Sequence, residues 1–332
     1  MRTWVVVLAV ALVAGCTAPA NRDVPQATSS SAEPLKDPRQ KSGPSTAKVS
    51  DVEPITGEAA PKLPTTVTDA QNTQVTVASA DRILAVDRHG TLAATVHGLG
   101  LGQRMVGRDA SAGLPLVTTN GHELDLQTVT ALRPTVVLTD TTLGPQDVVQ
   151  RLRDSGIPVV VTDSRRALNN VGTLIQQVAD ALGVPGEGEK LAHRTTVEVQ
   201  KAQITAQRLA DGAELRIVFL HLREGVHQVL GEGTGADELI TGVGGVDVAT
   251  EAGLRGAVPI SPEAVAGADV ILVMSQGLAA VGGVDGLLGV PGVAATPAGQ
   301  KRRVVDVDDH RVLSFGPLTG AVINGVAGAL YL

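Results

Sequence analysis

Hydrophobic and polar residues alternate with two different periods along most of the chain. Residues 65–78, TTVTDAQNTQVTVA, hold two Val/Thr-rich runs around a polar turn, which is typical of a β-hairpin. The apolar runs at 82–86 and 135–140 have the length of buried strands, whereas 90–102 and 145–156 have the spacing of helices and end at glycines. Short apolar strands that alternate with helices predict a mostly parallel α/β sheet.

The segment 167–210 has a different character, because it is amphipathic throughout and contains no strand-like run. Only the tripeptide VPG at 184–186 interrupts its helical pattern. Strand and helix patterns alternate again from the run LRIVFLHL at 215–222. The pattern therefore predicts an α/β lobe at 64–166, a helical connector at 167–210 and a second α/β lobe at 211–332.

The first sixteen residues, MRTWVVVLAVALVAGC, have the layout of an export signal. Arg2 precedes an apolar run from Trp4 to Val13 that is too short to span a bilayer, and small residues follow it. The end of the run resembles the bacterial lipobox, in which the cysteine is diacylated. Cys16 is the only cysteine of the chain. We therefore expect 1–15 to be a signal peptide and the mature protein to be lipid-anchored through Cys16. A plain signal peptide with a chance cysteine is the less favoured alternative.

The segment 16–63 that follows is rich in Pro, Ser, Thr and charged residues and nearly free of large apolar ones. Such a composition buries too little surface to offset the chain entropy that folding costs. We expect a flexible tether here, on the extracytoplasmic face of the cell membrane.

Composition and charge exclude several classes of function. Aromatic residues make up 1% of the chain, so a binding site must be lined by aliphatic side chains. The net charge of −7 and the absence of a basic run give no electrostatic footprint for nucleic acid. The chain has no nucleophile elbow, no P-loop and no HEXXH motif, and the GXGXG within residues 230–240 is a weak dinucleotide signal. We expect neither an enzyme nor a nucleotide-binding protein.

Three histidines are placed where a ligand could meet them. His122 follows a strand-like run on a βα loop, the usual position of ligands in parallel sheets, and Asn120 could cap the next helix. His221 and Arg223 are two residues apart in a strand, so they share a face. His227 follows on a turn and is a weaker candidate ligand. Position alone also allows each of them to be an ordinary surface or strand-end residue.

Several stretches together carry a resemblance to a known family. These are the lipobox, the polar tether, the long connector, TTNGHELDLQTVTALRPTVVLTD and GTGADELITGVGGVDVA. Together they resemble the substrate-binding lipoproteins of bacterial ABC importers, and more narrowly the haem-uptake (HmuT-type) binding proteins of actinobacteria. The resemblance implies a class III fold, in which a single long helix joins two Rossmann-like α/β lobes. It also implies haem b as the transported ligand in the cleft. The partners would be an ABC permease and its ATPase, and upstream surface haem-binding proteins.

The resemblance also assigns roles to the histidines. A histidine of the N-terminal lobe ligates the iron in this family, and it matches His122. The opposite ligand is usually the tyrosine of a Tyr-x-Arg motif, and here the motif is His221-Leu222-Arg223. A His122/His221 pair predicts six-coordinate, low-spin iron. Arg223 would favour the neutral form of the imidazole, or pair with a haem propionate. Asn120 and His227 are further candidates for haem contact.

Other ligands remain open at this stage. A ferric siderophore or a corrinoid would use the same fold, and a siderophore chelate would need no iron ligand from the protein. A Zn or Mn receptor would normally need three or four protein ligands. A haem-sensing lipoprotein without transport is a further alternative. Met105 and Met274 could pack against a porphyrin, although a core role is the more ordinary one.

Overall fold

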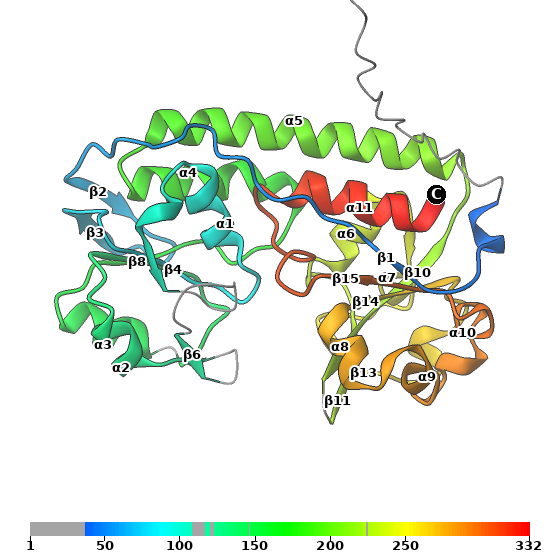
Figure 1. Ribbon diagram of the computed structural model, residues 1–332. Helices are drawn as coiled ribbons and strands as arrows, with labels where there is room; N and C mark the ends of the chain where they lie inside the picture. The colour runs from blue at the N-terminus through cyan, green and yellow to red at the C-terminus, as the bar shows by residue number, and fades with distance from the viewer. Residues whose placement is uncertain (1–36, 108–116, 120–122, 146, 224) are drawn as a thin grey trace, which may run out of the picture. The chain divides into compact units, whose positions relative to one another are not determined.

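The computed structural model of the chain describes residues 37–107, 117–119, 123–145, 147–223 and 225–332 (Figure 1). The chain divides into Met1–Glu33 and a compact unit Pro34–Leu332, and all described residues belong to the second. The predicted signal peptide and Cys16 lie outside the described residues. Across the described ranges, no helix is long and apolar enough to cross a membrane.

The N-terminal lobe contains a parallel four-stranded sheet with the order β5-β4-β8-β9. All described residues of β8 are buried, as expected for a central parallel strand covered on both faces. The predicted hairpin is formed by β2 and β3. The elements of the lobe are β2 (Thr65–Thr68), β3 (Gln74–Val77), β4 (Ile83–Ala85), α1 (Thr91–Gly98), β5 (Met105–Gly107), β6 (Thr118–Thr119), β7 (Glu123–Leu124), α2 (Leu126–Ala131), β8 (Val136–Thr139), α3 (Asp147–Asp154) and β9 (Val159–Val161).

The connector consists of two helices, α4 (Val171–Ala181) and α5 (Pro185–Ala210). The break falls at the predicted VPG, where Gly183 has a φ of +69° and a Cβ would lie 2.6 Å from the Lys62 carbonyl oxygen. Pro185 then opens α5, a position that suits its fixed φ and missing N–H. The single long helix implied by the class III fold is therefore α5, which has 26 residues.

The C-terminal lobe is built on a seven-stranded sheet. Its central strands β15, β14 and β10 are parallel, and the strands β11 and β13 that follow β10 toward one edge pair antiparallel. The elements are β10 (Arg216–Arg223), β11 (Val226–Leu230), α6 (Ala236–Gly242), β12 (Val246–Asp247), α7 (Val248–Glu251), β13 (Ala257–Pro259), β14 (Val270–Met274), α8 (Ser275–Ala280), α9 (Gly283–Leu288), α10 (Pro297–Lys301), β15 (Val304–Val307) and α11 (Thr319–Tyr331).

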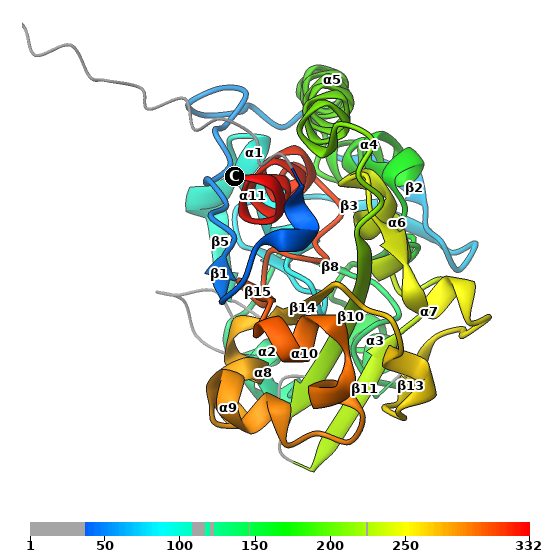
Figure 2. The ribbon, with the colours of Figure 1, turned by 90° about the vertical axis from the view of Figure 1, so that its right-hand side faces the viewer.

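Both faces of this second sheet are covered by helices. Figures 1 and 2 show α11 and α5 on one side of β14 and β15, and α8, α9 and α10 on the other. Ile217 and Phe219 of β10 belong to the hydrophobic core beneath α5 and α11, whereas Val218 and Leu220 belong to the core on the opposite face. This alternation fixes the direction of each later side chain of β10. The core beneath α5 and α11 also includes residues of the first lobe, such as Ile83.

The segment 16–63 is expected above to be a flexible tether, but from Asp37 onward the structure describes it packed on the rest of the chain. We call residues 37–63 the N-terminal arm. Its strand β1 (Ser45–Thr46) adds in parallel to β15 at the sheet edge. The Ile55 N–H then donates to the Gly98 carbonyl (2.7 Å) in the first lobe. Backbone hydrogen bonds hold the arm, and a composition that lacks large apolar residues does not reveal them.

Candidate ligand-binding site

Two of the predicted site residues, Asn120 and His122, lie outside the described residues. The structure describes what flanks them, the short antiparallel pair β6 and β7. The helix that follows begins at Leu126, and Asp125 caps it by accepting from the Gln127 N–H (2.8 Å). The cap expected from Asn120 is therefore supplied by an aspartate directly before the helix, a position at which carboxylates are strongly preferred.

The end of β10 carries the other predicted residues. His221 and Arg223 follow Ile217 and Phe219 in the two-residue period of the strand, so all four share one face. His221 is half-buried and Arg223 is exposed. His227 lies opposite Leu222 in the antiparallel register of β10 and β11, and directly opposed residues point to the same side. The register therefore separates His227 from His221, on the other face of the sheet.

Met274 is the neighbour of His221 across the parallel pair of β10 and β14. The register pairs Leu220 with Val273, so the next position along each strand places Met274 beside His221. Met274 is 9% exposed and belongs to the core beneath α5 and α11. Met105 begins β5 and packs against the same core. Of the two methionines, only Met274 is brought next to a predicted ligand.

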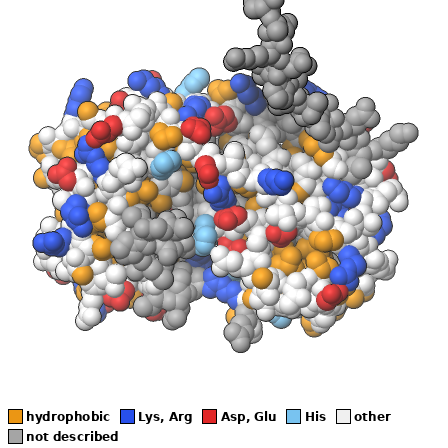
Figure 3. Space-filling model, in the orientation of Figure 1, with side chains coloured by type: hydrophobic (Ala, Val, Ile, Leu, Met, Phe, Trp, Pro, Cys, Tyr) orange, Lys and Arg blue, Asp and Glu red, His pale blue; other side chains and the backbone are white. Residues whose placement is uncertain are grey.

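The loop between β4 and α1 lies at the carboxyl end of a parallel strand of the first lobe. This loop holds His89, which is half-buried. Burial first, and then the positive charge of Arg166, lower the pKa of the His89 imidazole to about 4, and His221 contributes in the same direction. With its pKa lowered in this way, His89 is neutral at physiological pH. On the face drawn in Figure 3, histidine, acidic and basic side chains lie together near the middle.

A third loop, between β15 and α11, borders the same region. A Cβ at Gly90 would lie 3.2 Å from the His310 carbonyl oxygen, so this loop contacts the β4–α1 loop directly. The Asp309 carboxylate accepts from the Gln276 N–H at the start of α8 (2.8 Å), and burial raises the pKa of this carboxyl. Burial, and then Arg88, lower the pKa of Arg223, while Asp309 raises it.

A buried charge cluster, made of Asp87, Asp140 and Arg166, lies behind the β4–α1 loop. Arg166 donates through Nη2 to Asp140 (2.6 Å) and to Asp87 (3.4 Å). The side chains of Asp87, Asp140 and Arg166 are 0%, 1% and 4% exposed. Asp87 also accepts from the backbone N–H groups of His89 (2.8 Å) and Leu92 (2.7 Å). The cluster thus joins the carboxyl ends of β4 and β8 and fixes the loop that carries His89.

His89 and the buried charge cluster are absent from the residues predicted above. The available signal was the position of His89 directly after an apolar strand run, on a βα loop, which is the criterion that selected His122. No comparable signal existed for Arg166, because its two carboxylate partners are 79 and 26 residues away in the sequence.

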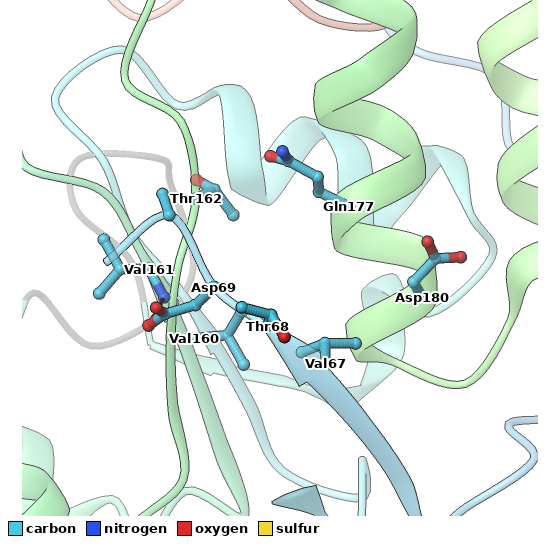
Figure 4. Close-up of a pocket in the computed structure, with 9 residues that line it drawn as sticks. Val67, Thr68, Asp69, Val160, Val161, Thr162, Gln177 and Asp180 are labelled. Carbon is cyan, nitrogen blue, oxygen red and sulfur yellow. Dashed lines mark hydrogen bonds between the residues drawn. The ribbon is translucent and has the colours of Figure 1, made fainter. Parts of the chain in front are cut away.

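A separate pocket of about 330 Å³ lies on the hairpin side of the first lobe. Figure 4 shows Val67 and Thr68 of β2 facing Gln177 and Asp180 of α4 across it, with Val160 of β9 below. None of its lining residues is a histidine. Across the described ranges, no three His, Cys, Asp or Glu side chains gather as a metal site.

Comparison with known proteins identifies the class. The sequence profile of the periplasmic binding protein family matches residues 89–310, more than half of the chain. The chain therefore belongs to the periplasmic binding protein family, in its class III arrangement of two α/β lobes joined by one long helix. These are substrate-binding proteins, in agreement with the expectation that the chain is not an enzyme. Among curated protein sequences, no significant match was found.

Within that class the chain is most informatively compared with haem-binding proteins of known structure. The haem-binding protein HmuT is 39% identical with a TM-score of 0.86, over 89% of this chain and 99% of that one. The periplasmic haem-binding protein RhuT of Roseiflexus sp. RS-1 is 36% identical with a TM-score of 0.71, over 76% of this chain and 98% of that one. HutB of Vibrio cholerae, also a periplasmic haem-binding protein, is 28% identical with a TM-score of 0.63, over 76% of this chain and 98% of that one.

Proposed function

We propose that this protein binds haem between its two lobes and delivers it to an ABC importer for haem or iron uptake. The observation that carries the proposal is the match to HmuT over almost the full described chain, at 39% identity. HmuT structures include alanine variants at a tyrosine and at an arginine two positions apart. The same spacing separates His221 from Arg223 at the end of β10.

The iron ligands in this proposal are His221 from the second lobe and His122 from the first. A phenolate is an anionic ligand that favours ferric iron, whereas a neutral imidazole binds ferrous and ferric haem. Histidine in place of tyrosine therefore predicts a low-spin, six-coordinate complex. Met274 supplies a polarisable side chain beside His221, and thioethers pack well against aromatic rings. Arg223 shares the face of His221 and supplies a positive charge for a haem propionate.

Membrane attachment is the second part of the proposal. A diacylated Cys16 would hold the protein at the outer face of the cell membrane, where the permease of the importer would receive the haem. Support comes from the lipobox-like sequence and from the lack of any other cysteine. Cys16→Ser expressed in an actinobacterial host should move the protein from the membrane fraction to the medium. Retention of that variant in the membrane would contradict the anchor.

Titration of the purified protein with hemin, followed by absorbance, tests the binding proposal. A saturable, red-shifted Soret band at one hemin per chain is expected. A ferric siderophore and a corrinoid, added in excess, should leave that band unchanged. Displacement of hemin by either compound would favour the corresponding ligand, and the absence of any saturable change would refute haem binding.

A further inference from the structure

The N-terminal arm, residues 37–63, contacts both lobes of the protein. In Figure 1 it is the blue trace that runs between β1 in the second lobe and the β2 hairpin in the first. The chain therefore crosses from one lobe to the other in the arm as well as in α5. A second crossing matters for the site between the lobes, because it ties together two bodies that one helix already joins.

The first half of the arm is fixed to the second lobe. Beyond the pairing of β1 with β15, the Ala47 N–H donates to the Asp306 carbonyl (2.8 Å). Arg303 is 1% exposed and donates to the Ser45 Oγ (2.9 Å) and to the Ala329 carbonyl (2.6 Å) near the end of α11. One buried guanidinium thus joins the arm, the β15 edge and α11.

The second half of the arm is fixed to the first lobe and to the connector. The Ile55 N–H donates to the Gly98 carbonyl (2.7 Å) at the end of α1, and the Lys62 N–H donates to the Gly183 carbonyl (2.8 Å) before α5. A Cβ at Gly98 would lie 3.2 Å from a methyl carbon of Val52, so the arm lies close against α1. Both halves are therefore attached independently of each other.

Two arginines hold the segment 49–54, where the arm passes between its attachments. Arg311 of the β15–α11 loop donates to the Val49 carbonyl (2.9 Å) and to the Asp51 carboxylate (2.6 Å). Arg194 of α5 donates to the Glu53 carbonyl (2.5 Å). Since an extended chain reaches at most about 3.6 Å per residue, this short segment cannot follow a large separation of the lobes without releasing an attachment.

We propose that the N-terminal arm is a strap that limits the rotation of the two lobes relative to each other. Lobes of one chain move by default unless their contact is large, so a second attachment reduces this freedom. The consequence for the ligand rests on the proposed function: a strap that opposes separation of the lobes slows the dissociation of haem held between them. Affinity differences between closely related complexes lie mostly in the dissociation rate, so the strap should act on that rate.

The test gives the strap slack while leaving its attachments in place. Six Gly/Ser residues are inserted between Asp51 and Val52 of the purified protein. Spin labels on Ser155→Cys, after α3, and Ala279→Cys, in α8, report on the two lobes, and Cys16→Ser removes the native cysteine; both labelled positions are exposed. Double electron–electron resonance of the haem-free protein should show a broader distribution of label distances with the insertion than without it. An unchanged distribution would overturn the strap.

The matched control carries the same insertion after Gly253, an exposed residue of the α7–β13 turn, and should keep the distribution of the protein without insertion. If circular dichroism shows that the arm insertion does not fold, Arg194→Ala with Arg311→Ala replaces it, with the exposed Arg208→Ala of α5 as control and the same two outcomes.

Transfer of hemin to excess apomyoglobin, followed by absorbance, measures the dissociation rate of the ligand. The rate should rise several-fold in the arm variant and stay unchanged in its control. A broader distance distribution with an unchanged rate would overturn the effect on haem release. Failure of the wild type to bind hemin would instead refute the proposed function, and the distance measurement would still decide whether the arm is a strap.

Discussion

Replacing Arg166 with methionine would leave the carboxylates of Asp87 and Asp140 buried together without a countercharge. All three side chains are at most 4% exposed, and the Arg166–Asp140 contact is 2.6 Å. Removal of one partner of a buried ion pair costs about 3–5 kcal/mol, because the remaining charge stays desolvated. Since whole domains are stable by only about 5–15 kcal/mol, Arg166→Met should lose a large share of the free energy of unfolding.

The loss of unfolding free energy caused by Arg166→Met should depend on pH, and the sign of that dependence can be worked out. Burial, followed by Asp87, already raises the pKa of Asp140 in the folded protein above its ordinary value of 3.8, and Arg166 opposes that rise. A folded carboxyl with a raised pKa holds its proton more tightly than the unfolded one. Its contribution to stability is therefore present at low pH and is lost as pH rises from 3.8 through the folded pKa. Without Arg166 the folded pKa of Asp140 rises further toward neutral pH. The loss of unfolding free energy should therefore be larger at pH 8 than at pH 5.

Urea unfolding followed by circular dichroism, at both pH values, measures this effect. Arg165→Met is the matched control, since Arg165 is 62% exposed and its contact with Asp163 is 3.9 Å. Adding Asp140→Asn to Arg166→Met removes the like-charge pair and should recover part of the lost stability. A loss below about 1 kcal/mol for Arg166→Met, the usual range of an exposed pair, would refute the reasoning. So would a loss that is equal at the two pH values.

Three further predictions follow from other contacts. Arg303→Met should lower the unfolding free energy by about 1.5–3 kcal/mol in urea melts, because the buried guanidinium donates to the Ala329 carbonyl (2.6 Å) at the end of α11. Gly100→Ala should cost about 1–2 kcal/mol in the same assay, because φ is +82° and a Cβ would lie 2.7 Å from the Thr56 carbonyl oxygen. A Gly100→Ala variant with an unchanged unfolding free energy would contradict this prediction. His227→Ala should leave the hemin titration unchanged, because its side chain lies on the other face of the sheet.

The sequence pattern was sufficient to predict the order of strands and helices, because a strand that is buried on both faces of its sheet has a continuous apolar run. The run TVVLTD became β8, and the break at VPG separated α4 from α5. The shared face of His221 and Arg223 also followed from the strand period alone. These features depend on residues close in the sequence.

Features that depend on distant residues could not be predicted. The register between β10 and β11 places His227 away from His221, and a strand pattern does not contain that register. Arg166 meets Asp87 and Asp140 only because β4, β8 and β9 are neighbours in the folded sheet. The N-terminal arm is held by main-chain hydrogen bonds and the parallel pairing of β1 with β15, and its polar composition gave no sign of either.

Iron coordination at the end of β10 is tested most directly by the electron paramagnetic resonance spectrum of the ferric hemin complex in the wild type and in His221→Tyr. Histidine at position 221 predicts a low-spin wild-type spectrum. Tyrosine restores the family motif and predicts a change to high-spin, phenolate-ligated iron. Identical spectra for the two proteins, or no bound hemin in the wild type, would contradict a haem site at this strand end.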